Sequence, residues 1–375
     1  MKILMLSNQS RSMSVFWRVL IQKARSAHCE IVCCVPPGDA HSEQALNQAG
    51  ARVIHYNLDR KGINPIADIR TWLELKKIFK KEKPDLLFAT TIKPVIYGCF
   101  AASACGIKSI YATITGLGYA FEADTFLKKA INRVSRMLYR ASLSRAQGIF
   151  FQNPDDRQIF LEQGILHKNA PILSARGTGV DTRHFAQAPL PDTGPGRPTV
   201  FLLVCRLLEA KGLREYAEAA RILKSVYPQT VFQILGPPET GPGSVTLEEV
   251  KSWFPDVVYL GQTDDVRDYI ARSHVMVLPS WREGLPTALM EGMSIGRACI
   301  ASNVPGCRHV IREGENGFLA KAKNPESLAR TMRKFLDNPA LMAIMGNAAR
   351  KMAENEFDAL KVADGILRDM GVEVS

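Results

Sequence analysis

Two basic side chains follow a predicted strand in the second half of the chain. The strand spans residues 199–204; Arg206 follows it, and Lys211 with Gly212 opens a predicted helix. Cations at the end of a strand, beside the positive end of a helix dipole, are suited to binding a diphosphate. Taken alone, the same pair is at least as well explained as a solvated charge pair in an ordinary strand–helix loop.

Two carboxylates follow a later predicted strand of the same half. The apolar run VMVLPS leads into a turn that holds Glu283, and Glu291 lies in the next helix, which we expect to begin at Pro286. Carboxylates accept paired hydrogen bonds from vicinal hydroxyls, so the two residues suit a sugar. Backbone amides at the helix start could bind anionic or hydroxyl groups; they belong to Gly284, Leu285 and Thr287. The simpler alternative is that Glu283 only interacts favourably with the helix dipole and that Glu291 is merely exposed.

The positions of these residues depend on a regular alternation of strands and helices. Apolar, β-branched stretches alternate with amphipathic segments, which predicts parallel sheets covered on both faces. The predicted strands of the first half are 2–6, 31–35, 52–55, 86–90, 109–113, 148–152 and 171–174. Those of the second half are 199–204, 231–235, 257–260, 275–279, 298–301 and 317–319.

A segment dense in Pro and Gly, residues 186–198, interrupts the alternation and predicts a linker. The sequence therefore predicts an α/β protein with two doubly wound, Rossmann-like domains, residues 1–185 and 199–356. We expect a cleft between the carboxyl ends of the two sheets, where such folds bind ligands. Residues 357–375 are expected to form a C-terminal helix that packs back towards the N-terminal domain.

The composition is that of an ordinary globular protein. Of the 375 residues, 46% are hydrophobic and 23% charged, enough for a core in each of two domains. The eight cysteines have no C-x-x-C spacing, which predicts reduced core thiols. Neither a signal peptide nor a membrane span is recognisable, so we expect a cytoplasmic protein.

The excess of positive charge lies in the first half. Residues 1–185 hold 26 basic and 14 acidic side chains, a charge of +12, while the remainder holds 22 and 23, a charge of −1. Such a half-molecule suggests a nucleic acid, a polyanion or an anionic membrane face as partner.

One predicted helix, residues 125–145, carries cations every three or four residues. They are Lys129, Arg133, Arg136 and Arg140. The helix also carries apolar side chains, namely Leu127, Ile131, Val134 and Leu138. A basic amphipathic helix suits an anionic leaflet, at about 1 kcal/mol per cation near the surface. The alternative is a solvated charged face above a core stripe.

Together, the features of the second half resemble the retaining nucleotide-sugar glycosyltransferases of family four, which have the GT-B fold. The matching residues are Arg206, Lys211-Gly212, Glu283 and Glu291 with seven residues between them, V-P-G at 304–306, and E-N-G-F-L at 315–319. The first half resembles a narrower group, bacterial enzymes that extend undecaprenyl-diphosphate-linked sugars in O-antigen, capsule and protein-glycosylation pathways. Its matching segments are I-N-P-I-A-D at 63–68, K-P-V-I-Y-G at 93–98, T-G-L-G-Y-A-F at 115–121 and N-P-D-D at 153–156.

The resemblance implies a role for each residue on the donor side. Arg206 and Lys211 would neutralise the diphosphate of a UDP-sugar, Glu291 would bind the ribose, and Glu283 would bind the transferred sugar. Gly236 would border the base. The resembled group uses galactose-type sugars, often N-acetylgalactosamine, and makes α linkages on an undecaprenyl-diphosphate-linked saccharide at the inner membrane face.

The acceptor side is less well defined. Many relatives carry a histidine in the loop after the fifth strand, where this sequence has Thr115, and threonine cannot act as a general base at neutral pH. The acceptor-side candidates are Arg11, Lys93, Thr115, Gly116 and Tyr119. The aromatic residues Tyr97, Tyr119 and Phe121 could stack on the acceptor or pack their own loop.

No metal or other cofactor is expected beyond the UDP-sugar. The sequence has no D-x-D, and its seven histidines form no cluster of familiar spacing. Two alternatives remain open: a GT-B nucleotide-sugar epimerase, and a non-catalytic nucleotide- or polyanion-binding protein. A Rossmann dehydrogenase is disfavoured because no G-x-G-x-x-G follows the first strand. On the favoured interpretation the partners are the donor, the lipid-linked acceptor and an anionic membrane surface, and nucleic acid is not among them.

Overall fold

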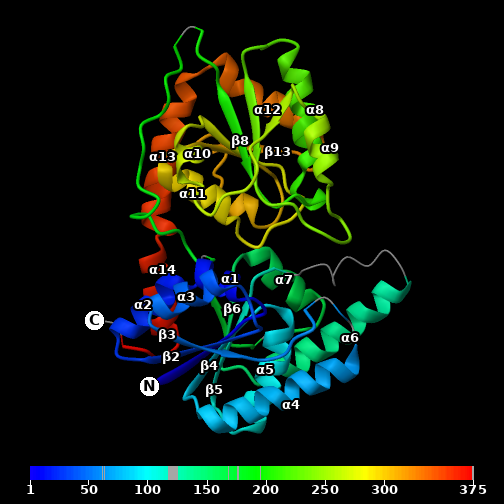
Figure 1. Ribbon diagram of the computed structural model, residues 1–375, viewed down its shortest axis with the longest axis vertical. Helices are drawn as coiled ribbons and strands as arrows, with labels where there is room; N and C mark the ends of the chain where they lie inside the picture. Colours follow the sequence, from blue (N-terminus) through cyan, green and yellow to red (C-terminus); the bar gives the residue numbers. More distant parts are fainter. Residues whose placement is uncertain are drawn as a thin grey trace. The chain divides into compact units, whose positions relative to one another are not determined.

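The computed structural model describes residues 1–60, 62, 64–116, 126–167, 169–174, 177–194 and 196–373, with side chains except at 126–131 and 174. Within these ranges the chain forms two compact α/β units (Figure 1). The first comprises Met1–Gly179 and Ala359–Ser375, and the second comprises Val180–Asp358. The chain thus crosses between the units twice.

The first unit is built around a parallel sheet that has seven strands among the described residues, in the order β3-β2-β1-β4-β5-β6-β7. The strands are β1 (Lys2–Leu6), β2 (Glu30–Val35), β3 (Ala51–His55), β4 (Leu86–Thr90), β5 (Ser109–Ile114), β6 (Gly148–Phe151) and β7 (Ile172–Ser174). Most central-strand residues are buried, because helices cover both faces of the sheet.

Helices of the first unit lie in two layers, one on each face of the sheet. They are α1 (Ser10–Phe16), α2 (Arg18–Ser26), α3 (Ala40–Gln48), α4 (Pro65–Glu82), α5 (Ile92–Ala104), α6 (Phe126–Leu143), α7 (Pro154–Glu162) and α14 (Ala359–Asp369). The start of α4 is set by Asn64, whose side chain accepts a hydrogen bond from the Ile66 amide, and by Pro65 in the first turn.

The last helix, α14, completes the first unit although it comes from the end of the chain. It packs against α2, where Lys23 Nζ lies 2.9 Å from Asp364 Oδ1. Its buried residues Ile366 and Leu367 belong to the same hydrophobic cluster as Trp17 of the first segment. One face of the first sheet is therefore sealed by residues far away in the sequence.

The second unit has a parallel sheet with six strands among the described residues, in the order β10-β9-β8-β11-β12-β13. The strands are β8 (Val200–Val204), β9 (Val231–Leu235), β10 (Val257–Tyr259), β11 (Val275–Leu278), β12 (Ala298–Ser302) and β13 (Gly317–Ala320). The helical elements are η2 (Glu209–Lys211), α8 (Leu213–Lys224), α9 (Leu247–Ser252), α10 (Arg267–Ala271), α11 (Thr287–Ile295), η3 (Cys307–His309), α12 (Pro325–Asp337) and α13 (Ala340–Glu356).

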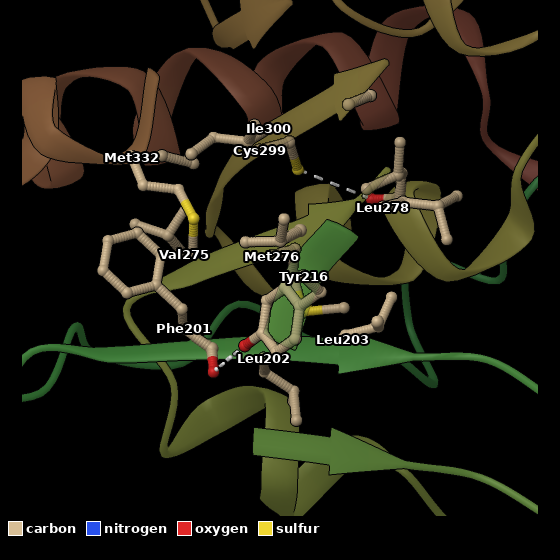
Figure 2. Close-up of a cluster of buried hydrophobic side chains, with 14 of the residues drawn as sticks. Phe201, Leu202, Leu203, Tyr216, Val275, Met276, Leu278, Cys299, Ile300 and Met332 are labelled. Carbon is tan, nitrogen blue, oxygen red and sulfur yellow. Dashed lines mark hydrogen bonds between the residues drawn. The ribbon is translucent and has the colours of Figure 1, made fainter. Parts of the chain in front are cut away.

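The core of the second unit joins β8, β11 and β12 to the helices around them. Figure 2 shows Phe201, Met276 and Ile300 from these strands beside Met332 of α12. Tyr216 of α8 is fully buried, and its hydroxyl donates a hydrogen bond of 2.9 Å to the carbonyl of Phe201. This packing fixes the ends of β8 and β11, from which the loops that carry Arg206 and Glu283 emerge.

The strands predicted from the sequence are all present, and their ends differ from the prediction by at most one residue. The segment 186–198 belongs to the second unit. The fully buried Arg297 holds it by donating hydrogen bonds to the carbonyls of Ala188 (3.0 Å) and Pro189 (2.8 Å). Among the described residues, no helix is both long enough and apolar enough to cross a membrane.

Candidate functional site

The chain reverses its winding direction between β8 and β11, so the carboxyl ends of these two neighbouring strands lie side by side at one edge of the second sheet. In doubly wound sheets this is the point at which ligands bind. Arg206 and Lys211 follow β8, whereas Glu283 lies between β11 and α11. Residues 72 positions apart, Lys211 and Glu283, are brought into contact there.

The contact between Lys211 and Glu283 is a close ion pair, with Lys211 Nζ 2.5 Å from Glu283 Oε1. Their side chains are 22% and 13% exposed, so the pair is only partly open to solvent. Ser280 donates a second hydrogen bond of 2.7 Å to the same carboxylate oxygen. The sequence placed these two residues in one site but did not predict that they touch.

The pair keeps Lys211 charged although it lies in a buried position. Burial of the ammonium acts to lower the pKa of Lys211, but the charge of Glu283 and the hydrogen bond to it outweigh that effect. The pKa of Lys211 consequently lies above its ordinary value. A fixed positive charge thus remains beside the start of α8.

A close approach of two loops makes this contact possible. Gly212 has a φ of +73°, and a Cβ there would lie 2.1 Å from the carbonyl oxygen of Pro279. The Trp281 amide donates a hydrogen bond of 2.9 Å to the carbonyl of Ala210. The Lys-Gly dipeptide is therefore needed for two separate reasons: lysine for its charge, and glycine for the space that it leaves.

A third loop, after β12, supports Glu283 from the other side. The Glu283 amide donates a hydrogen bond of 3.2 Å to Pro305, and Gly306 has a φ of +82°. A Cβ at Gly306 would lie 2.5 Å from the carbonyl oxygen of Glu283 and 2.7 Å from that of Gly284. The V-P-G motif at 304–306 therefore supports the Glu283 turn.

Gly236, at the end of β9, also lies in close contact with the loop that carries Arg206. Its φ is +150°, and a Cβ would lie 1.8 Å from the carbonyl oxygen of Cys205. Tyr259 donates a hydrogen bond of 2.9 Å to the Gly236 carbonyl. The loop that follows β9 is therefore held beside the loop that follows β8.

Arg206 does not share the contacts of Lys211. Its Nη1 lies 2.7 Å from Oε2 of Glu239, in the loop after β9. The Arg206 side chain is 56% exposed and that of Glu239 is 22% exposed. Sequence reasoning missed Glu239, and the only signal for it was an acidic residue in the turn G-P-P-E-T directly after a predicted strand.

Glu291 lies in α11, which begins at Thr287, one residue later than expected, with Pro286 at the N-cap position. No side chain caps the start of this helix. Burial raises the pKa of the Glu291 carboxyl to about 8, and no described residue donates a hydrogen bond to it. In its ionised form this carboxyl is a strong acceptor of hydrogen bonds.

In the first unit, Lys93 at the start of α5 donates hydrogen bonds to Asp68 Oδ1 (2.7 Å) and to the carbonyl of Asp59 (2.8 Å). The ion pair joins the segments I-N-P-I-A-D and K-P-V-I-Y-G. Burial, together with a hydrogen bond to Asp68, raises the pKa of Tyr97 in α5. Lys93 is thus anchored at the carboxyl edge of the first sheet.

The remaining acceptor-side candidates are placed less fully. Arg11 is exposed in α1, and Thr115 and Gly116 follow β5 and are partly buried. Tyr119 and Phe121 lie outside the described residues, as does the side chain of Lys129 in α6.

The amphipathic character of α6 extends to a neighbouring helix. On α6, Arg133 and Arg140 are exposed, Arg136 is half-buried, and the apolar Val134 and Met137 are 55% and 64% exposed. Helices α4 and α6 both pack against α5 (Figure 1). The α4 helix likewise exposes apolar side chains near its start, those of Ile66, Ile69 and Leu73.

A separate cavity of about 410 Å³ in the second unit lies beside Gln187, Arg297 and Asn347 and contains none of the predicted site residues. Over the described residues, no group of three His, Cys, Asp or Glu side chains is arranged to hold a metal ion. The Lys211–Glu283 contact makes the carboxyl edge of β8 and β11 the candidate site.

Two doubly wound parallel sheets, with paired cations and carboxylates at the carboxyl edge of the second, define a glycosyltransferase of the GT-B fold. Residues 2–153 match the family model "Glycosyl transferase 4-like", and residues 191–352 match "Glycosyl transferases group 1". The chain belongs to this family of glycosyltransferases, and the resemblance drawn from the motifs is confirmed.

Two curated relatives align over most of the chain. The N,N'-diacetylbacillosaminyl-diphospho-undecaprenol alpha-1,3-N-acetylgalactosaminyltransferase of Campylobacter jejuni is 26% identical, covering 98% of this chain and 96% of the relative. The UDP-Gal:alpha-D-GlcNAc-diphosphoundecaprenol alpha-1,3-galactosyltransferase of Escherichia coli is 27% identical, covering 84% and 82%. Both are transferases, so an epimerase or a non-catalytic binding protein is not favoured.

Among solved structures, Anabaena Alr3699/HepE in complex with UDP and glucose is similar in fold. The TM-score is 0.78, with 16% sequence identity over 100% of both chains. At this identity the similarity confirms the GT-B fold predicted from the sequence.

The close approach at Gly306 yields a test of how the Glu283 turn is supported. Gly306→Ala should destabilise the second unit by about 1–3 kcal/mol more than Gly314→Ala, as measured by urea unfolding. Both glycines have a φ near +80°, but a Cβ at Gly314 meets no atom within 4 Å. The backbone strain is therefore matched, and equal losses in the two variants would contradict a supporting role for Gly306.

Proposed function

We propose that the protein transfers a galactose-type sugar, N-acetylgalactosamine or galactose, from a UDP-sugar to an undecaprenyl-diphosphate-linked saccharide, with retention, forming an α-glycosidic bond. The observation that carries the proposal is the Lys211–Glu283 contact at the edge of the second sheet, with Arg206 and Glu291 on the adjoining segments. The two relatives that align over most of the chain are named for transfers of this type.

The donor would be held by two cations, which bind its diphosphate, and by two carboxylates, which bind its hydroxyls. Arg206 and Lys211 would neutralise the diphosphate as it leaves, which is the main electrostatic task of the reaction. Glu283 would accept hydrogen bonds from hydroxyls of the transferred sugar, and Glu291 from those of the ribose. Amides at the start of α11, beginning with Thr287, would add donors to the sugar and phosphate oxygens.

The reaction would take place on one face of the sugar. The bond from the anomeric carbon to the UDP oxygen breaks, and the acceptor oxygen bonds to the same face through an oxocarbenium-like state. Thr115 cannot accept the proton of the acceptor hydroxyl at neutral pH. That proton would therefore pass to the departing diphosphate oxygen, which Arg206 and Lys211 would stabilise.

The lipid-linked acceptor suggests that the enzyme works peripherally at the cytoplasmic face of the inner membrane. Helix α6 supports this with cations beside exposed Val134 and Met137. Exposed apolar residues of α4, among them Ile66 and Ile69, give a second helix of similar character. Cations next to exposed apolar side chains fit an anionic lipid surface.

The proposed activity can be tested with purified protein, a panel of UDP-sugars and a short-chain undecaprenyl-diphosphate saccharide. We expect transfer from a UDP-galactose-type donor, undiminished by EDTA, and a loss of at least about 100-fold in Glu283→Ala. The control is Glu218→Ala, a carboxylate paired with Arg221 on the surface of the same unit. Interconversion of the free UDP-sugar, or binding without transfer, would contradict the proposal.

The raised pKa of Glu291 predicts a pH dependence of donor binding. A protonated carboxyl is a weaker acceptor than a carboxylate and turns one of its oxygens into a donor, so UDP should bind the ionised form more tightly. Because the pKa is about 8, affinity for UDP should rise roughly five- to ten-fold between pH 7 and 8.5 and then level off. Calorimetry would measure this, and Glu291→Gln should bind more weakly without the rise. A flat profile in the unmodified protein would rule out the proposed role.

The membrane contact predicts salt-sensitive binding to anionic liposomes. Reversing the charges of Arg133, Arg136 and Arg140 to glutamate should weaken binding by more than about 100-fold at low salt, because losing three cations alone costs roughly 1 kcal/mol each. A control of equal charge change reverses three exposed arginines of the second unit, Arg221, Arg330 and Arg333. Equal losses in both variants, measured by liposome flotation, would show that net charge rather than α6 determines binding.

A further inference from the structure

Each cation proposed for the donor diphosphate is already paired with a carboxylate, but the two pairs differ in kind. Lys211 and Glu283 form a contact of 2.5 Å with side chains that are 22% and 13% exposed. Arg206 meets Glu239 through one nitrogen, at 2.7 Å, and its own side chain is 56% exposed. The Arg206 pair is therefore the more open of the two to an incoming anion.

Glu239 is held beside Arg206 by the backbone. The Leu207 amide donates a hydrogen bond of 3.0 Å to Pro237, and the Glu209 amide one of 2.8 Å to Gly243. The loop after β9 is thus bonded to the loop after β8 on both sides of Glu239. These bonds hold the backbone of Glu239 within reach of Arg206.

We propose that Glu239 is a positioning residue that competes with the nucleoside diphosphate for Arg206 and so hastens release of UDP after transfer. This inference rests on the proposed function. A guanidinium has five donors in a planar fork, and Glu239 uses one of them, so a phosphate can engage Arg206 while the carboxylate is still near. Two anions that share one cation repel each other, and each weakens the binding of the other.

The size of the effect follows from the exposure of the pair. Ion pairs between exposed side chains contribute little, and losing such a competitor should change affinity about two- to five-fold. The carboxylate thus moderates the hold of Arg206 on UDP without abolishing it. A ligand that lacks phosphates should not respond to Glu239, because it makes no use of Arg206.

The test is Glu239→Gln, which keeps the shape of the side chain and one acceptor oxygen but removes its charge. UDP should bind about two- to five-fold more tightly by calorimetry, through a slower dissociation rate by surface plasmon resonance, and the gain should shrink at high salt. Uridine should show no change. The matched control is Glu249→Gln, which removes a carboxylate paired with Arg214 in the same unit and should leave UDP binding unaltered.

The other outcomes separate this inference from the proposed function. Weaker UDP binding in Glu239→Gln would mean that Glu239 contacts the ligand, and unchanged binding would mean that it does not compete; either overturns the inference. A faster association rate with unchanged dissociation would overturn the role in release. If Arg206→Ala weakens UDP binding while Glu239→Gln has no effect, the proposed function stands and this inference alone fails. If the unmodified protein binds no UDP, both fail.

Discussion

The contact between Lys211 and Glu283 is the interaction on which the proposed donor site depends. It requires three loops, after β8, β11 and β12, to meet at one point, and each approach is closer than any side chain would permit. Glycine is therefore fixed at 212 and 306 by the same geometry that brings the two charges together. The ion pair between Lys211 and Glu283 therefore depends on the turn conformations at Gly212 and Gly306 and on the absence of a Cβ at both positions.

Much of the fold could be predicted from the sequence because parallel strands buried on both faces appear as continuous apolar runs. The strand ends follow from the same pattern, since the apolar run stops where the chain leaves the sheet. The unit boundaries were harder to place. Segment 186–198 has the composition of a linker, yet Arg297, which is more than a hundred residues away, binds it to the second unit. No local pattern reports a contact of that kind.

The candidate site, like the fold, was predicted from the sequence only in part. Residue types and spacing indicated Arg206, Lys211, Glu283 and Glu291, because strand ends converge at one edge of a parallel sheet. The sequence could not predict which carboxylate pairs with which cation. No local pattern indicates that Lys211 pairs with Glu283 and Arg206 with Glu239. In the first unit, the ion pair between Lys93 and Asp68 joins the motifs I-N-P-I-A-D and K-P-V-I-Y-G. The sequence identified both motifs by resemblance but did not indicate that they touch.

The contribution of α14 to the first unit has a consequence for engineering. An exchange of one unit between this enzyme and a relative could be attempted with a single cut near the middle of the chain, but the first unit contains both ends of the chain. Such a graft would pair the α2 helix of one parent with the α14 helix of the other, so the packing around Ile366, Leu367 and Met370 would be mismatched. A viable exchange must take two pieces, Met1–Gly179 and Ala359–Ser375, from the same parent. The two segments of the first unit must therefore be exchanged together, because substitutions in one are constrained by its packing against the other.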